Sequence, residues 1–136
     1  MPERPPLPDE PAERIRCKRV YRAARISDGR RILVDRLWPR GIAKDRARLV
    51  DWCRDIAPSA ALRRRFHADP DAWEDFRAGY LNELDQRDDL VRRIAAHARE
   101  GVVTLVYAAK DEDHNNATVL RDHLVAWLRQ ERPDDV

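Results

Sequence analysis

Cysteine is scarce in this chain, and long hydrophobic runs are missing. The 136 residues contain two cysteines, Cys17 and Cys53, and no CxxC pair. Zinc knuckles and thioredoxin-like redox sites are therefore excluded, and both cysteines are expected to be reduced thiols. No apolar run is long enough to cross a bilayer, and the N-terminus lacks the hydrophobic stretch of a secretion signal. These absences predict a cytoplasmic protein with no membrane partner.

The motifs of several common enzyme classes are absent as well. The chain contains no P-loop, no GxGxxG and no GxSxG, so the usual nucleotide-cofactor and hydrolase classes gain no support. A metal site built from Asp35, Asp111, Asp113 and His114 is a weak alternative, because their spacing matches no strong ligand motif. We therefore expect neither a cofactor nor a metal.

Lysine is also rare. Only three of the 27 basic residues are lysines (Lys18, Lys44 and Lys110), and 25 acidic residues leave a net charge of +2. This balance does not by itself indicate nucleic acid or an anionic membrane as a partner. Arginine recognises phosphate and carboxylate better than lysine does, although genomic base composition is the simpler explanation for most of the arginines. With 43% hydrophobic and 38% charged residues, one compact domain with a charged surface is expected.

The two ends of the chain differ in composition from its body. Residues 1–13 hold five of the nine prolines and no hydrophobic pattern, which is typical of a disordered tail. Residues 131–136 form a similar short C-terminal tail. A single domain is therefore predicted over residues 14–130.

Three strands are predicted in the body. Residues 15–21 and 30–38 carry short apolar patterns, and the turn signal Asp28-Gly29 could pair these two strands. Residues 102–109, with the sequence VVTLVYAA, form the clearest strand. Because this strand is β-branched and almost entirely apolar, both of its faces should be covered.

A polar loop and a helix follow the last predicted strand. Asn115 or Asn116 can cap this helix. Strand, loop and capped helix make up the βα unit of an α/β sheet. The fold class is therefore predicted to be α/β, with a short, mainly parallel sheet flanked by helices.

Helical spacing predicts further helices in the middle of the chain. Apolar residues in 49–56 follow a helical period, and Ser59 can cap a second helix. Asp69-Pro70 is a good N-cap and first-turn pair for a third helix, and Gly101 should end a fourth. One core is expected to combine residues from these helices, the last strand and the final helix, by their helical or strand spacing: Trp73, Phe76, Tyr80, Leu105, Leu120, Leu124 and Trp127.

Functional side chains gather after two of the predicted strands. Ligands of open α/β sheets lie outside the carboxyl ends of the strands. The two clusters would meet in one cleft if these strands are parallel neighbours. Each member also has a simpler structural explanation, such as a core tryptophan or an aspartate near a helix N-terminus. The clusters comprise Asp35, Arg36, Trp38 and Arg40, then Lys110, Asp111, Asp113, His114 and Asn115.

Three separated segments resemble a known family. They are ILVDRLWPRGIAK, DWCRDIAPSAALRRRF and VTLVYAAKDEDHNNATVL, which are similar to the YeaO-like branch of the domain-of-unknown-function 488 family. The resemblance runs from about Val20 to Leu128. It implies a compact α/β domain of the bacterial cytoplasm whose activity is not established.

The resemblance also implies which positions carry the family signature. Arg54 stands where the family pattern usually shows lysine, which makes a lysine-specific role there doubtful. A sister branch resembles this one but has a Cys-His-Arg motif in the loop that here reads His114-Asn115-Asn116, so thiol chemistry should not be transferred. The signature positions include Asp35, Arg36, Trp38, Pro39, Arg40, Gly41, Trp52, Pro58, Ser59, Arg63, Phe66, Lys110, Asp111, His114, Asn115 and Ala117.

The sequence is compatible with two functions. It does not decide whether the protein is an enzyme or what its oligomeric state is. The first is a cleft for a small anion such as a nucleotide or phosphoester, with guanidinium and ammonium groups holding the anion and an imidazole or carboxylate as general base. The second is a nucleic-acid-binding module that uses the ALRRRF helix and exposed tryptophans. The candidate catalytic residues are His114, Asp35 and Asp111, and the candidate substrate-binding residues are Arg36, Trp38, Arg40, Arg63, Lys110 and Asn115.

Overall fold

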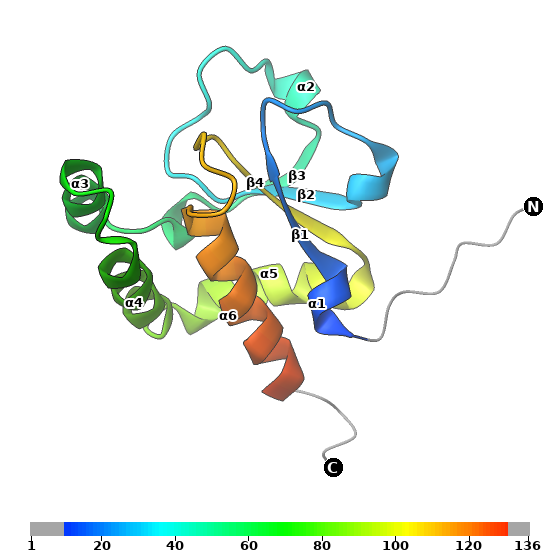
Figure 1. Ribbon diagram of the computed structural model, residues 1–136. Helices are drawn as coiled ribbons and strands as arrows, with labels where there is room; N and C mark the ends of the chain where they lie inside the picture. The colour runs from blue at the N-terminus through cyan, green and yellow to red at the C-terminus, as the bar shows by residue number, and fades with distance from the viewer. Residues whose placement is uncertain (1–9, 131–136) are drawn as a thin grey trace, which may run out of the picture.

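Four short parallel strands form the sheet in the computed structural model, which describes residues 10–130 (Figure 1). They are β1 (Ile15–Arg19), β2 (Arg30–Leu33), β3 (Leu49–Trp52) and β4 (Val103–Tyr107). Their order across the sheet is β1-β4-β2-β3, and every neighbouring pair is parallel. The predicted α/β class with a short parallel sheet is confirmed.

The longer helices pack on one face of this sheet. Side chains that alternate along the strands, such as Ile32 and Leu105, belong to one buried cluster with side chains of these helices. The expected core residues Phe76, Tyr80 and Leu124 are buried in it. The helices are α3 (Ala60–Ala68), α4 (Trp73–Leu84), α5 (Asp88–Glu100) and α6 (Asn116–Gln130), with the short α1 (Pro11–Arg14) beside α6. None of the helices within residues 10–130 is long and apolar enough to cross a membrane.

The opposite face of the sheet is covered by short segments. These include η1 (Ile26–Asp28) and α2 (Lys44–Ala47). The Asp28 carbonyl accepts a hydrogen bond from Thr104 Oγ1 of β4 at 2.7 Å, and the Ala47 carbonyl accepts one from Arg31 Nε of β2 at 2.8 Å. Because these contacts cover the second face, β4 is buried along its whole length, as expected.

The predicted pairing of the first two strands is wrong. β1 and β2 do not contact each other as neighbours, because β4 lies between them and pairs with both. Gly29 does have a positive φ of 65°, but it serves a close approach to β4 and not a hairpin. A Cβ at Gly29 would lie 2.3 Å from the Val102 carbonyl oxygen, and the next amide, that of Arg30, donates to that same oxygen at 2.8 Å.

The helix expected over residues 49–56 is also wrong. Residues Leu49–Trp52 form β3, and Arg54–Ile56 form the single turn η2. β3 pairs with β2, and the ladder continues as the Cys53 amide donates to the Leu33 carbonyl at 2.9 Å. The backbone hydrogen bonds available from β2 therefore outweigh the helical spacing of the apolar residues.

The predicted start of the α4 helix is wrong, whereas other predicted helix ends are confirmed. Asp69 ends α3, and its carboxylate accepts from the Asp71 amide at 3.2 Å, so Asp69-Pro70 forms a turn before α4 begins at Trp73. Ser59 caps α3 by accepting from the Leu62 amide at 3.2 Å. Gly101 is the C-cap of α5, as expected.

The last three residues of the N-terminal tail predicted over residues 1–13 are helical in the structure. Residues 11–13 belong to α1, where Ala12 packs against the core and its carbonyl accepts from Arg121 Nη2 at 2.6 Å. Residues 1–9 and the predicted C-terminal tail, residues 131–136, lie outside the described residues.

Candidate functional site

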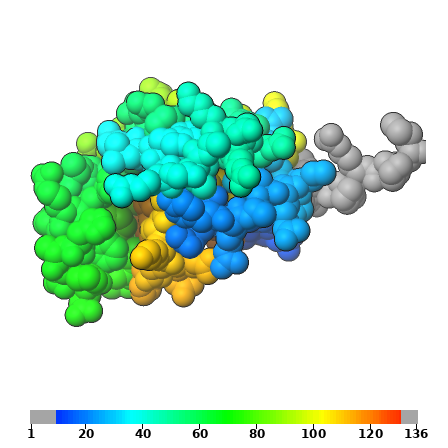
Figure 2. Space-filling view, turned by 90° about the horizontal axis from the view of Figure 1, so that it is seen from above, coloured from blue at the N-terminus to red at the C-terminus, as the bar shows by residue number. Residues whose placement is uncertain are grey.

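A cleft of about 370 Å³ opens at the carboxyl ends of β2 and β4. These two strands are parallel neighbours, so the segments that follow them emerge side by side. Figure 2 looks down on this edge, where α3 and α4 (green), residues 35–48 (cyan) and the segment after β4 (orange) come together. The described residues that line the cleft are Asp35, Arg36, Leu37, Trp38, Pro39, Arg40, Ala57, Pro58, Arg63, Phe66, His67, Phe76, Ala108, Ala109, His114, Asn115 and Asn116.

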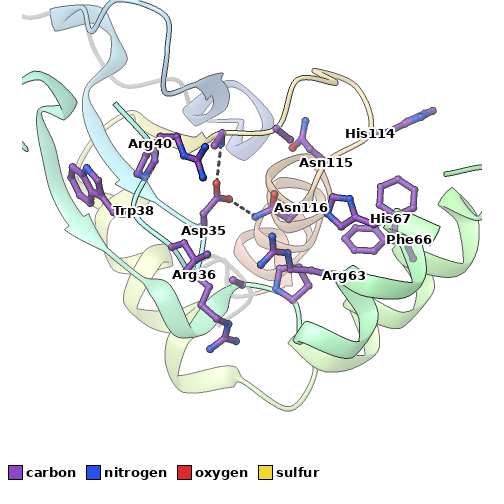
Figure 3. A pocket seen from close by; sticks show the side chains of 17 residues that line it. Asp35, Arg36, Trp38, Arg40, Arg63, Phe66, His67, His114, Asn115 and Asn116 are labelled. Carbon is purple, nitrogen blue, oxygen red and sulfur yellow. Dashed lines mark hydrogen bonds between the residues drawn. The ribbon is translucent and has the colours of Figure 1, made fainter. Parts of the chain in front are cut away.

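Asp35 lies in the middle of the cleft and is held from two sides (Figure 3). Its Oδ2 accepts from the Ala108 amide at 2.9 Å, and its Oδ1 accepts from Asn116 Nδ2 at 3.0 Å. Asn116 Nδ2 also donates to the Val34 carbonyl at 3.2 Å, which fixes the amide in place. Burial raises the pKa of Asp35, and the two hydrogen bonds and the charge of Arg63 offset this only in part.

Arginines surround this carboxylate without being paired to it. In Figure 3 the guanidinium groups of Arg40 and Arg63 lie on opposite sides of Asp35, whereas that of Arg36 points away from it. Within residues 10–130, none of these three guanidinium groups has a hydrogen-bond or ion-pair partner at all. Among the described residues, these guanidinium groups therefore give the cleft cationic charge that is not held in any ion pair, with Asp35 as the carboxylate nearby.

Aromatic rings form the wall of the cleft on the side of α3 and α4. Phe66 stacks on Phe76 with ring centroids 4.7 Å apart, and Trp73 lies 5.7 Å from Phe66. Arg63, Phe66 and His67 are three and four residues apart on α3, so they share one helix face. This face gives the cleft an apolar surface next to a cation.

Trp38 belongs to the cleft mainly as a fixed part of its wall. Its ring packs edge-on against Trp52 at 5.4 Å. Its Nε1 donates to the Ile42 carbonyl at 2.7 Å, and Trp52 Nε1 donates to the Asp35 carbonyl at 2.8 Å. Both tryptophans therefore brace the segment after β2.

His114 and Asn115 line the cleft but are not placed alike. The His114 ring stacks on Trp73 with centroids 4.6 Å apart and points away from Asp35 in Figure 3. Asn115 is buried and caps α6, since its Oδ1 accepts from the Thr118 amide at 3.0 Å and its Nδ2 donates to the Asp111 carbonyl at 2.9 Å. In this structure Asn115 shapes the loop, and His114 is not aimed at the carboxylate.

Two predicted site residues lie outside the lining. Lys110 and Asp111 are exposed, so the expected convergence of Lys110 on the cleft is wrong. Asp111 Oδ1 accepts from the amides of His114 and Asp113 at 3.0 and 2.9 Å, and these bonds lower its pKa. Asp111 therefore organises the loop after β4. Within residues 10–130, no group of three or more His, Cys, Asp or Glu side chains is placed to hold a metal ion.

Several lining residues were not among the predicted site residues, and Asn116, Phe66 and His67 are the polar and aromatic ones that matter most for the site. Asn116 was expected only as a possible helix cap, although it fixes Asp35. Phe66 and His67 follow the predicted Arg63 by three and four positions, and this helical spacing was the signal that could have revealed them. The cysteines, in contrast, take no part in the lining, and burial raises the pKa of Cys17 to about 12 and also raises that of Cys53.

A family whose sequence model is described as "Inactive DUF488-N3 subclade" matches residues 14–136. The chain belongs to the DUF488 family. The resemblance seen in the sequence is therefore confirmed. A comparison with solved structures finds no match.

Relatives of this DUF488 chain occur in Escherichia coli and in Mycobacterium tuberculosis. It is 48% identical over 115 residues to the uncharacterized protein YeaO of Escherichia coli, which covers 85% of this chain and 96% of YeaO. It is 40% identical over 107 residues to the uncharacterized protein Rv3073c of Mycobacterium tuberculosis, covering 79% of this chain and 90% of that protein. The chain thus matches these two relatives over almost their whole length.

Proposed function

We propose that this DUF488 domain binds a small anion, such as a nucleotide or phosphoester, in the cleft at the ends of β2 and β4. The observation that carries the proposal is the pair of guanidinium groups of Arg40 and Arg63, which flank the cleft and have no partner within residues 10–130. Unpaired guanidinium groups are suited to phosphate, which they hold through bidentate hydrogen bonds. The aromatic wall of Phe66 and Phe76 can pack against a planar group of the same ligand.

We further propose that the cleft binds its ligand without converting it. The support for this part of the proposal is that the family model that matches is described as inactive. A general base must lie within hydrogen-bond reach of the proton that it removes. The His114 ring points away from Asp35 and neither cysteine lines the cleft, so Asp35 and His67 are the lining groups that a test for turnover addresses. The proposal includes a cytoplasmic location, in which the free thiols of Cys17 and Cys53 would stay reduced.

Neighbouring arginines on α3 provide a matched test. Arg63 lines the cleft, whereas Arg64 is exposed and lies outside the lining. AMP and inorganic phosphate should each raise the unfolding temperature of the wild type, and Arg63→Gln should weaken their binding about tenfold or more, as loss of a charge-assisted hydrogen bond does. Arg64→Gln removes the same charge and should bind like the wild type.

Isothermal titration of both variants gives the affinities, and release of phosphate from AMP reports any turnover. If neither AMP nor phosphate binds the wild type, or if both variants lose affinity equally, binding in the cleft is wrong. Release of phosphate that Arg63→Gln abolishes would instead make the protein an enzyme.

A second candidate function is binding of nucleic acid. It is favoured by Arg64 and Arg65, which are exposed next to Arg63 on α3. It is disfavoured by Trp38 and Trp52, whose rings pack on each other and whose ring N–H groups donate to backbone carbonyls, so they are poor platforms for bases. Nucleic-acid binding should weaken steeply with salt and with Arg64→Gln, whereas binding in the cleft should not respond to Arg64→Gln.

A further inference from the structure

Asp35 has hydrogen-bonding capacity that the protein does not use. An ionised carboxylate can accept about four hydrogen bonds. Within residues 10–130, Asp35 accepts two, one from the Ala108 amide and one from Asn116 Nδ2. Those residues also provide no cation within ion-pair distance of it. Because Asp35 lines the cleft, its unused acceptor positions are available to a ligand there.

The position of this carboxylate is fixed before any ligand arrives. Ala108 follows β4 directly, and Asn116 begins α6 while holding the Val34 carbonyl at the end of β2. Asp35 is thus bound to the two strands whose ends form the cleft. Among the described residues of the lining it is the only acidic one, between the cations of Arg40 and Arg63 (Figure 3).

A negative group inside a cationic cleft has a chemical consequence. An anion drawn in by Arg40 and Arg63 meets the Asp35 carboxylate, which repels it unless the ligand brings a hydrogen to share. A hydroxyl or a P–OH group supplies that hydrogen and turns the repulsion into a charge-assisted hydrogen bond. Sulfate carries no such hydrogen at neutral pH, whereas inorganic phosphate keeps one.

We infer that Asp35 is a specificity-determining residue, which makes the cleft select anions that also donate a hydrogen bond over anions that cannot. This inference rests on the proposed function. The donor can come from two sources, the protonated phosphate itself or a hydroxyl of the group that carries it. In both cases the group that accepts the hydrogen bond is the Asp35 carboxylate.

Four probes separate these sources. Sulfate, inorganic phosphate, glucose 6-sulfate and glucose 6-phosphate are titrated into the full-length wild type at pH 7. Sulfate should bind about tenfold or more weakly than the best of the donor-bearing anions, the size expected from one charge-assisted hydrogen bond. If phosphate binds more tightly than sulfate, while sulfate and glucose 6-sulfate bind with equal affinity, the donor is the P–OH group. If glucose 6-sulfate exceeds sulfate, the donor is a hydroxyl.

Asp35→Asn tests the residue itself. This variant should bind sulfate more tightly and lose the preference, because the negative charge that repels sulfate is gone and one acceptor oxygen is replaced by an NH2 donor. Asp45→Asn removes the same charge at an exposed position of α2 outside the lining and should keep the wild-type preference. If Asp35→Asn fails to fold, the ratio of the sulfate affinity to the phosphate affinity of the wild type still tests the inference.

The outcomes distinguish this inference from the proposal beneath it. If AMP or phosphate binds the wild type but sulfate binds equally well, the selection is wrong and anion binding survives. If a folded Asp35→Asn still prefers donor-bearing anions over sulfate, another residue is responsible for the selection and the inference is overturned. If no anion, AMP included, binds the wild type, the proposed function has failed and the inference fails with it.

Discussion

Asp28 and Asp35 are both withdrawn from solvent, yet their surroundings shift their pKa values in opposite directions. Burial acts to raise the pKa of both carboxyls. At Asp28 the Arg25 amide and the side chains of Lys18 and Arg31 outweigh burial and lower the pKa. At Asp35 two uncharged donors and a more distant guanidinium do not, and the pKa stays raised. One carboxylate thus stabilises the fold, whereas the other is kept unpaired at a cleft.

This difference predicts how Asp35→Asn changes stability with pH. A raised pKa in the folded state means that folding favours the protonated carboxyl, so ionisation costs stability as pH rises from about 3.8, the ordinary value, through the folded value. Asparagine cannot ionise. The free energy of unfolding of Asp35→Asn should therefore rise relative to that of the wild type between pH 4 and pH 7.

Urea unfolding of both proteins across this range measures the difference. A constant offset between the two curves would show that Asp35 has the same pKa in both states. Asp45→Asn, at an exposed position on α2, controls for the loss of one negative charge.

At the scale of single elements, α3 is the helix on which the cleft depends most. It carries Arg63, Phe66 and His67, and its first turn is closed by Ser59. Ser59→Ala removes this cap and should lower the free energy of unfolding by about 1 kcal/mol. Ser27→Ala, at an exposed position in η1, should change it by less than about 0.5 kcal/mol. Chemical denaturation of both variants checks this, and equal losses would mean that the cap does not hold α3.

The elements that could be predicted from sequence are those that local chemistry decides. The Ser59 cap and the β-branched run of β4 carry their own signals, and both were predicted correctly. β3 could not be predicted in this way, because Leu49, Trp52, Cys53 and Ile56 fit a helical period and become a strand and a turn only by pairing with β2. The order of the strands was equally hidden, since β4 enters between β1 and β2 from about 70 residues further along the chain.

The same division holds for the candidate site. The rule that ligands lie at strand ends correctly predicted that Asp35, Arg40 and His114 line a common cleft, although their function stays a prediction. The rule fails for Lys110 and Asp111, which are exposed. Asp111 instead accepts from the amides of Asp113 and His114 within its own loop. Side-chain direction depends on these loop contacts, which spacing in the sequence does not encode.

At the scale of the whole molecule, one buried ionic cluster connects most of the sheet. On the face away from the long helices, Asp28 binds Arg31 Nη1 of β2 at 2.7 Å and Lys18 Nζ of β1 at 3.1 Å. The Asp28 carbonyl accepts from Thr104 of β4, and Arg31 Nε donates to the Ala47 carbonyl of α2. β1, β2 and the sequence-distant β4 are thus tied to one residue of η1. This cluster stands where a doubly wound sheet would have its second helical layer.

The two cations of this cluster differ in exposure, and this predicts unequal effects of mutation. The Arg31 side chain is 2% exposed, and that of Lys18 is 16% exposed. Asp28→Asn would leave the buried Arg31 charge uncompensated, which should cost about 3–5 kcal/mol of unfolding free energy. Lys18→Met leaves Asp28 paired with Arg31 and should cost less than half as much.

Because the pKa of Asp28 is lowered, its stabilisation is present above about pH 3.8 and is lost as pH falls through the folded value. The gap between the wild type and Asp28→Asn should therefore narrow below pH 3.8. Urea unfolding at pH 7 and between pH 4 and pH 2 measures both effects, and equal losses in the two variants would show that Arg31 does not need Asp28.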